Sequence, residues 1–257
     1  MTGPMTEPRA PAAAMRERGD TAMDVGARVR ALAWPVIEAS LDASGYATTG
    51  RLLRAEECAA LVASYEQSAG FRSRVVMERH GYGRGEYRYL DYPLPSVVAG
   101  LRDALYTALA PIANRWMEAL GRATRYPATH RVYIEQCRAR GQTKPTPLLL
   151  RYGAGDYNCL HQDLYGEEMF PLQATFLLAD PERDFRGGEL CVTTSRPRRQ
   201  SRVDVVPLRL GEGAIFAVRD RPEAGPRGWR KVAMRHGVSV LHSGSRTTLG
   251  IILHDAQ

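Results

Sequence analysis

The chain has 257 residues, of which 44% are hydrophobic and 25% are charged, and its formal net charge is +7. This is the composition of a globular protein with a substantial core. No apolar run reaches the ~18–20 residues of a membrane span, and the first residues lack the apolar segment of a secretory signal, so we expect a soluble, cytoplasmic protein with no membrane partner. The four cysteines form no C-x-x-C pair, which excludes a zinc ribbon and a thioredoxin-like redox motif.

Residues 1–24 mix proline, alanine, arginine and acidic residues, a composition that predicts a disordered leader. Residues 25–144 are mainly helical in pattern, because apolar residues recur every three or four positions. The predicted helices cover residues 31–41, 53–65, 97–120 and 130–140. Ser96 is expected to cap the third helix, and Pro111 to kink or interrupt it.

A hairpin is predicted at residues 71–92, where two strand-like runs flank a glycine-rich turn with Gly81, Gly83 and Gly85. Aromatic and basic side chains gather around its tip. We expect four of them to contact the substrate, because arginine pairs with phosphate and tyrosine stacks on a base. They are Tyr82, Arg84, Tyr87 and Arg88.

Short β-rich runs separated by Gly, Pro and Asp fill residues 145–257. They predict strands at 147–152, 172–179, 188–194, 203–210, 213–218, 231–240 and 247–254. Many short strands at this spacing are typical of a double-sheet jelly roll. The predicted fold class is α+β, with a jelly-roll core at 145–257 supported by the N-terminal helices. No linker divides residues 25–257, so we expect a single domain.

A basic excess lies between Arg196 and His236, where eleven residues are basic and four are acidic. Such an excess can bind a polyanion, or it can be an ordinary solvated face. Arg198 and Arg199 in the RPRRQSR segment are the candidate contacts to a phosphate-rich substrate.

A histidine and a carboxylate, His161 and Asp163, stand two residues apart in the HQD motif. On a strand such residues share a face, so both side chains can reach one metal ion. His236, on a separate predicted strand, completes a set of two histidines and one carboxylate, the facial triad that leaves three positions open on ferrous iron. His242 is the rival for the third ligand, but it lies near a predicted turn.

A carboxylate clamp is predicted at Arg246, ten residues after His236, because a guanidinium binds a carboxylate through two parallel hydrogen bonds. The distal end of 2-oxoglutarate requires such a clamp. Thr248 shares the strand face of Arg246 and supplies a hydroxyl. Tyr152, nine residues before His161, supplies a phenol to the same co-substrate.

These motifs, RYGAGDYNCLHQD, DFRGGEL, GEGAIFAV and RHGVSV with SGSRTTLGIILHD, resemble the 2-oxoglutarate–iron oxygenases in order and spacing. That superfamily includes prolyl hydroxylases and AlkB-type oxidative DNA demethylases. The resemblance implies a double-stranded β-helix (cupin-like) fold, with Fe(II), 2-oxoglutarate and O2 as cofactor and co-substrates. It implies that His161, Asp163 and His236 bind the metal and so form the catalytic centre. It also implies that Arg246 and Tyr152 bind the co-substrate.

More narrowly, residues 45–257 resemble a bacterial oxygenase family usually described as nucleic-acid-modifying. The resemblance implies hydroxylation of a C–H bond with release of succinate and CO2, and oxidative demethylation of bases in single-stranded or damaged nucleic acid. The ten-residue gap between His236 and Arg246 is nearer the hydroxylase pattern, which keeps a hydroxylase of a protein side chain, amino acid or small metabolite as an alternative. A third alternative is a non-enzymatic β-barrel binding module.

Overall fold

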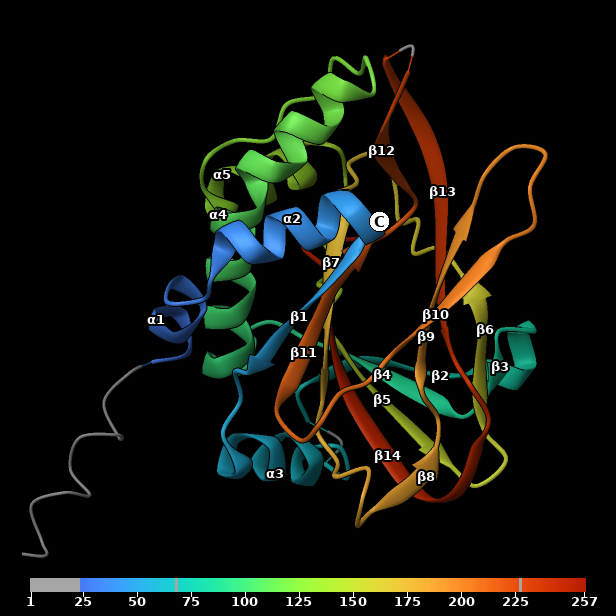
Figure 1. Cartoon of the computed structure of the whole chain (residues 1–257). Coiled ribbons are helices and arrows are strands. Elements are labelled where there is room, and N and C mark those ends of the chain that lie inside the picture. Colours follow the sequence, from blue (N-terminus) through green and yellow to red (C-terminus); the bar gives the residue numbers. More distant parts are fainter. Residues whose placement is uncertain (1–23, 68, 227) are drawn as a thin grey trace, which may run out of the picture.

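The computed structural model describes residues 24–67, 69–226 and 228–257 (Figure 1). The predicted leader, residues 1–24, lies outside this part of the chain except for its last residue. The fold is α+β, with two antiparallel sheets stacked as a double-stranded β-helix and helices on the outer side of the larger sheet. Among the described residues, no helix is long and apolar enough to cross a membrane.

Five helices are described, and four of them match predicted helices with shifted ends. The helix that was not predicted is α1, which has only six residues. They are α1 (Val25–Arg30), α2 (Trp34–Ser44), α3 (Ala55–Ser64), α4 (Ser96–Ala119) and α5 (His130–Ala139).

The predicted cap of α4 was wrong, and of the two effects predicted at Pro111 the interruption does not occur. Ser96 is the first helical residue rather than the cap, because Pro95 takes the cap position and Ser96 makes no capping hydrogen bond. The helix also continues through Pro111 without interruption. A buried stripe that includes Leu105, Leu109 and Trp116 packs into the core, and this packing holds the helix across the hydrogen bond that proline cannot make.

The larger sheet has the strand order β1-β11-β7-β14-β5-β4-β2, and β8 pairs with β14. The prediction found β5, β7, β11 and β14, but it missed β1 and β8. The strands are β1 (Tyr46–Arg51), β2 (Phe71–Val76), β4 (Glu86–Leu90), β5 (Leu148–Gly153), β7 (Leu172–Leu177), β8 (Phe185–Gly187), β11 (Glu212–Ala217) and β14 (Leu241–Ile251).

The smaller sheet has the order β10-β9-β13-β6-β3, and β12 pairs with β13. The rings of Phe216 on β11 and His236 on β13 meet with centroids 4.6 Å apart, so the two sheets face each other at this point. The strands are β3 (Gly83–Arg84), β6 (Tyr157–His161), β9 (Leu190–Ser195), β10 (Arg202–Val206), β12 (Asp220–Gly225) and β13 (Gly228–Val238).

The predicted hairpin at 71–92 is confirmed in its pairing of β2 with β4, but its connection is more than a turn. A 3-10 helix, Met77–His80, leads into β3, and β3 leaves the larger sheet to pair with β6. The backbone N–H of Cys159 also donates to the carbonyl of Tyr82. The segment therefore bridges the two sheets beside the strand that carries His161.

Candidate active site

The two histidines of the predicted triad are direct cross-strand partners, because His161 on β6 is in register with His236 on β13. Their ring centroids are 4.2 Å apart. In β6 a bulge lies between Asn158 and His161, and a Cβ built on Gly237 would lie 2.7 Å from the carbonyl oxygen of Asn158. Only glycine fits this close approach of two backbones.

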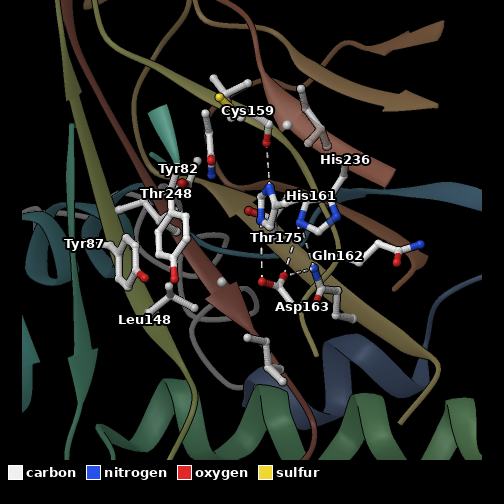
Figure 2. A pocket seen from close by; sticks show the side chains of 18 of the residues that line it. Tyr82, Tyr87, Leu148, Cys159, His161, Gln162, Asp163, Thr175, His236 and Thr248 are labelled. Carbon is white, nitrogen blue, oxygen red and sulfur yellow. Dashed lines mark hydrogen bonds and ion pairs between the residues drawn. The ribbon is translucent and has the colours of Figure 1, made fainter. Parts of the chain in front are cut away.

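Asp163 reaches the histidines by a route that differs from the prediction. Strand β6 ends at His161, so Asp163 follows the strand rather than sharing its face. Between them, the side-chain amide of Gln162 donates to the backbone carbonyl of Met234 at 2.7 Å. This bond attaches the segment after β6 to the neighbouring β13 and turns Asp163 toward the histidines (Figure 2).

The ligand atoms of His161, Asp163 and His236 all lie within 4.8 Å of one another. Asp163 Oδ1 is 3.5 Å from His161 Nε2, and Asp163 Oδ2 is 3.2 Å from His236 Nε2. Adjacent ligands of an octahedral ion with bonds of ~2.1 Å are about 3 Å apart. The three groups are thus spaced to occupy adjacent positions on one metal ion after small adjustments.

In its neutral form, each imidazole can present a lone pair to this centre. His161 Nδ1 lies 2.8 Å from the carbonyl oxygen of Cys159, which can only accept, so Nε2 carries the lone pair. His236 Nε2 lies 3.1 Å from the side-chain amide nitrogen of Gln173, which can only donate. The buried Nδ1 of His236 has no hydrogen-bond partner among the described residues.

The electrostatics of the triad favour a cation. Burial opposes ionisation of Asp163, but hydrogen bonds and charge from His161 and His236 outweigh it and hold the pKa of Asp163 well below its usual value. Burial also opposes protonation of His161, yet the Asp163 carboxylate raises the pKa of His161. At His236 burial dominates and lowers the pKa. The centre is an ionised carboxylate beside a neutral buried imidazole, a donor set that suits ferrous iron.

The predicted clamp, Arg246 on β14, is in register with Tyr152 on β5, and both side chains are buried, at 3% and 1% exposed. Arg246 Nη1 has no hydrogen-bond partner among the described residues, so a buried charge is left to receive a ligand carboxylate. Burial raises the pKa of Tyr152 to about 12, which keeps its phenol a hydrogen-bond donor. Thr248 lines the same cavity.

The side chain of Arg246 crosses Gly188 of the DFRGGEL motif. A Cβ on Gly188 would lie 3.0 Å from Arg246 Cδ and 2.7 Å from Leu241 Cδ1, and its φ of +66° disfavours other residues. Gly188 therefore leaves the space through which Arg246 reaches the cavity. The DFRGGEL motif was visible in the sequence, but this contact was not.

A cavity of about 410 Å³ joins the triad to Arg246. Tyr82 and Tyr87, two of the predicted substrate contacts, line it, and Tyr82 is 51% exposed (Figure 2). Arg84 is exposed on β3 next to this region. His242, the rival ligand, is exposed and does not line the cavity.

The other predicted substrate contacts lie elsewhere. Arg88 donates to the carbonyl oxygens of Tyr65 and Gln67 and lies over the Tyr65 ring. It therefore links β4 to the segment that follows α3. Arg198 and Arg199 are exposed in the β9–β10 connection and do not line the cavity.

Comparison with known proteins places the chain in a family. The model of a family described as "oxygenase, catalysing oxidative methylation of damaged DNA" matches residues 85–256. The chain belongs to this oxygenase family. Uncharacterised proteins from two strains of Mycobacterium tuberculosis are 47% identical to the oxygenase over 164 residues, covering 64% of this chain and 70% of each relative.

Solved structures share the fold at low sequence identity. A 2OG-Fe(II) oxygenase family oxidoreductase from Burkholderia pseudomallei has a TM-score of 0.50 at 16% identity, covering 87% of this chain and 92% of its own. A prolyl hydroxylase from Trichoplax adhaerens, solved with a hypoxia inducible factor peptide, has a TM-score of 0.50 at 14% identity, covering 88% of this chain and 90% of its own. The family match makes the chain an oxygenase, and its fold is the one found in these 2OG-Fe(II) oxygenase structures.

Proposed function

We propose that this oxygenase demethylates N-methylated bases in single-stranded or unpaired nucleic acid. In this proposal His161, Asp163 and His236 hold Fe(II), while Arg246, Tyr152 and Thr248 bind 2-oxoglutarate. One observation carries it: a single cavity joins the three convergent ligands, the unpaired Arg246 and an exposed tyrosine at its mouth. The description of the matching family supports the choice of nucleic acid.

When bound, iron with O2 and 2-oxoglutarate supplies the oxidising power to hydroxylate an unactivated C–H bond, and 2-oxoglutarate leaves as succinate and CO2. One oxygen atom enters the methyl group and the other enters succinate. An N-hydroxymethyl base then loses formaldehyde, and its nitrogen regains a hydrogen.

The chain's own residues bind the co-substrate, orient the base and exclude water. Arg246 fixes the distal carboxylate of 2-oxoglutarate by two charge-assisted hydrogen bonds in a buried setting. Tyr87, Leu148 and Leu150 line the cavity and present mainly apolar surface to a flat ring. Such a pocket holds a base away from bulk water, which strengthens every polar contact inside it.

The cavity mouth offers a stacking surface. His80 and Tyr82 stack with ring centroids 5.3 Å apart and an interplanar angle of 23°. Arg79 and Arg84, on either side in the chain, are exposed and supply positive charge for phosphates. Because β3 pairs with β6, a base stacked here is held at a fixed position relative to His161.

Succinate formation tests the proposal. The iron-loaded enzyme is assayed with methylated single-stranded DNA, the matching duplex, RNA, peptides and free nucleosides. We expect turnover to be fastest with the methylated single strand, and Tyr82→Ala to slow it while Tyr46→Ala does not, because Tyr46 lies on β1 away from the cavity. Turnover confined to a peptide or metabolite would instead favour the hydroxylase that the His236–Arg246 spacing also fits.

A further inference from the structure

The candidate ligand Asp163 receives two hydrogen bonds from elements that have no predicted role in catalysis. The hydroxyl of Tyr165 donates to Asp163 Oδ1 at 3.0 Å, and the amide of Gln173, on β7, donates to Asp163 Oδ2 at 2.7 Å. The two donors reach opposite oxygens of the same carboxylate. Together they fix the plane of a group whose last torsion is otherwise soft.

The Tyr165 hydroxyl is itself oriented by a hydrogen bond. Tyr89, which is buried on β4, donates its hydroxyl hydrogen to the Tyr165 oxygen at 3.0 Å. The Tyr165 hydroxyl has a single hydrogen, and with Tyr89 as its donor that hydrogen is free to point at Asp163. The Arg72 guanidinium lies 4.2 Å over the Tyr89 ring and packs against its outer side.

The two phenols thus form an ordered series that ends on a charged acceptor. A hydrogen bond to a carboxylate is stronger than one between neutral groups, and successive hydrogen bonds polarise one another. The Tyr165 ring also contacts the His254 ring, with centroids 6.2 Å apart. Tyr165 is therefore fixed both at its hydroxyl and along its ring.

We propose that Tyr165 is a positioning residue for the metal, which orients the Asp163 carboxylate for binding while Tyr89 orients Tyr165. This inference rests on the metal site of the proposed function. Partners that orient a ligand from behind commonly change metal affinity by 10- to 100-fold when removed. Tyr165 has no contact of its own with the other two ligands among the described hydrogen bonds, so its effect has to pass through Asp163.

The test measures metal binding rather than turnover. The full-length protein, freed of metal, is titrated with Co(II), and both the dissociation constant and the visible absorption of bound Co(II) are recorded. Tyr165→Phe keeps the ring and removes only the hydroxyl. We expect its Co(II) dissociation constant to rise about tenfold or more, with an altered absorption spectrum because the carboxylate binds in a different orientation.

Tyr106→Phe is the matched control, because Tyr106 is also a buried tyrosine whose hydroxyl donates one hydrogen bond, to the Pro127 carbonyl, away from the site. It should bind Co(II) as the unaltered protein does. Tyr89→Phe removes the outer hydroxyl alone, and we expect a loss of roughly two- to threefold. That variant remains a test if Tyr165→Phe does not fold.

Two outcomes overturn the inference. One is a Tyr165→Phe protein with unchanged Co(II) affinity and spectrum, or an unchanged Tyr89→Phe protein where Tyr165→Phe does not fold. The other is an equal loss of affinity in Tyr106→Phe, which would trace the effect to stability. His161→Ala distinguishes failure of the Tyr165 inference from failure of the metal site itself. Co(II) binding that survives in His161→Ala would show that the triad does not hold the metal.

Discussion

His161 and His236 are paired directly across two neighbouring strands, although 75 residues separate them in the sequence. Their side chains share one face because cross-strand partners in an antiparallel sheet point the same way. A slip of one residue in this register would turn His236 to the opposite face and remove it from the site. The candidate metal centre therefore depends on the pairing of β6 with β13.

Gly237 allows the close pairing of β6 with β13, and its replacement by alanine should weaken metal binding. The new Cβ would lie 2.7 Å from the Asn158 carbonyl oxygen, so β6 and β13 have to separate. We expect Gly237→Ala to lower the free energy of unfolding by roughly 1–3 kcal/mol and to weaken Co(II) binding. Gly225→Ala, whose Cβ meets nothing nearer than 3.4 Å, is the control. Equal behaviour of the two variants in urea unfolding and Co(II) titration would contradict the prediction.

Arg246→Lys should weaken 2-oxoglutarate binding while leaving the metal in place. Lysine keeps the charge but loses the two-pronged geometry, and the loss of a charged hydrogen bond costs roughly 1.5–3 kcal/mol. That corresponds to about a tenfold to hundredfold higher dissociation constant for 2-oxoglutarate, measured by calorimetry on the Co(II) protein. Arg186→Lys changes an exposed neighbour outside the active-site cavity and should bind normally. Unchanged affinity in Arg246→Lys would assign the carboxylate to another cation.

Gly188→Ala should resemble Arg246→Lys, although it removes no functional group. The added methyl group meets the Arg246 arm at 3.0 Å and the backbone is strained at φ +66°. We expect weaker 2-oxoglutarate binding with little change in Co(II) affinity. If Gly188→Ala lowers stability but binds 2-oxoglutarate as tightly as the unaltered protein, then Gly188 serves only the local backbone conformation.

Acid should destabilise the protein partly through His254. This side chain is fully buried, and burial, with the nearby charge of Arg102, lowers its pKa to about 3. The unfolded chain has the ordinary value of ~6.5, so it takes up the proton first. The contribution to stability is complete above pH ~6.5 and is lost as the pH falls toward 3.

His254→Asn should therefore flatten the decline in stability below pH ~6.5. The asparagine oxygen can still accept the hydrogen bond that the Phe170 amide donates to His254. Urea unfolding at several pH values measures the slope, and His242→Asn at an exposed position is the control. Identical slopes for His254→Asn and the unaltered protein would show that another group titrates, such as buried His130, whose pKa is also lowered to about 3.

Local pattern predicted the fold class, four of the helices and most long strands, because apolar spacing reports which face of an element is buried. It missed β6, whose five residues are exposed or half-buried and show no alternation. It also missed β12, which pairs with the next strand in the chain, β13. Strand β6 depends on pairing with β3 and β13, which are distant in the sequence, and no local signal encodes that.

The motifs brought His161, Asp163, His236 and Arg246 to attention because their spacing carries chemistry. The supporting residues were not visible in the same way. Tyr165 and Gln173 act through contacts that exist only after β4, β7 and the segment after β6 come together. Arg88 is the converse case, since a basic residue that the sequence predicted to contact substrate instead donates to the backbone carbonyls of Tyr65 and Gln67.

In the proposed function, the triad and the cavity remove methyl groups from nucleic-acid bases. This is tested by the ratio of formaldehyde to succinate released from one N-methylated single-stranded oligonucleotide, with the unmethylated oligonucleotide as blank. We expect one formaldehyde for each succinate above the blank, and neither product with Asp163→Ala. Succinate without formaldehyde, or equal release from Asp163→Ala, would contradict it.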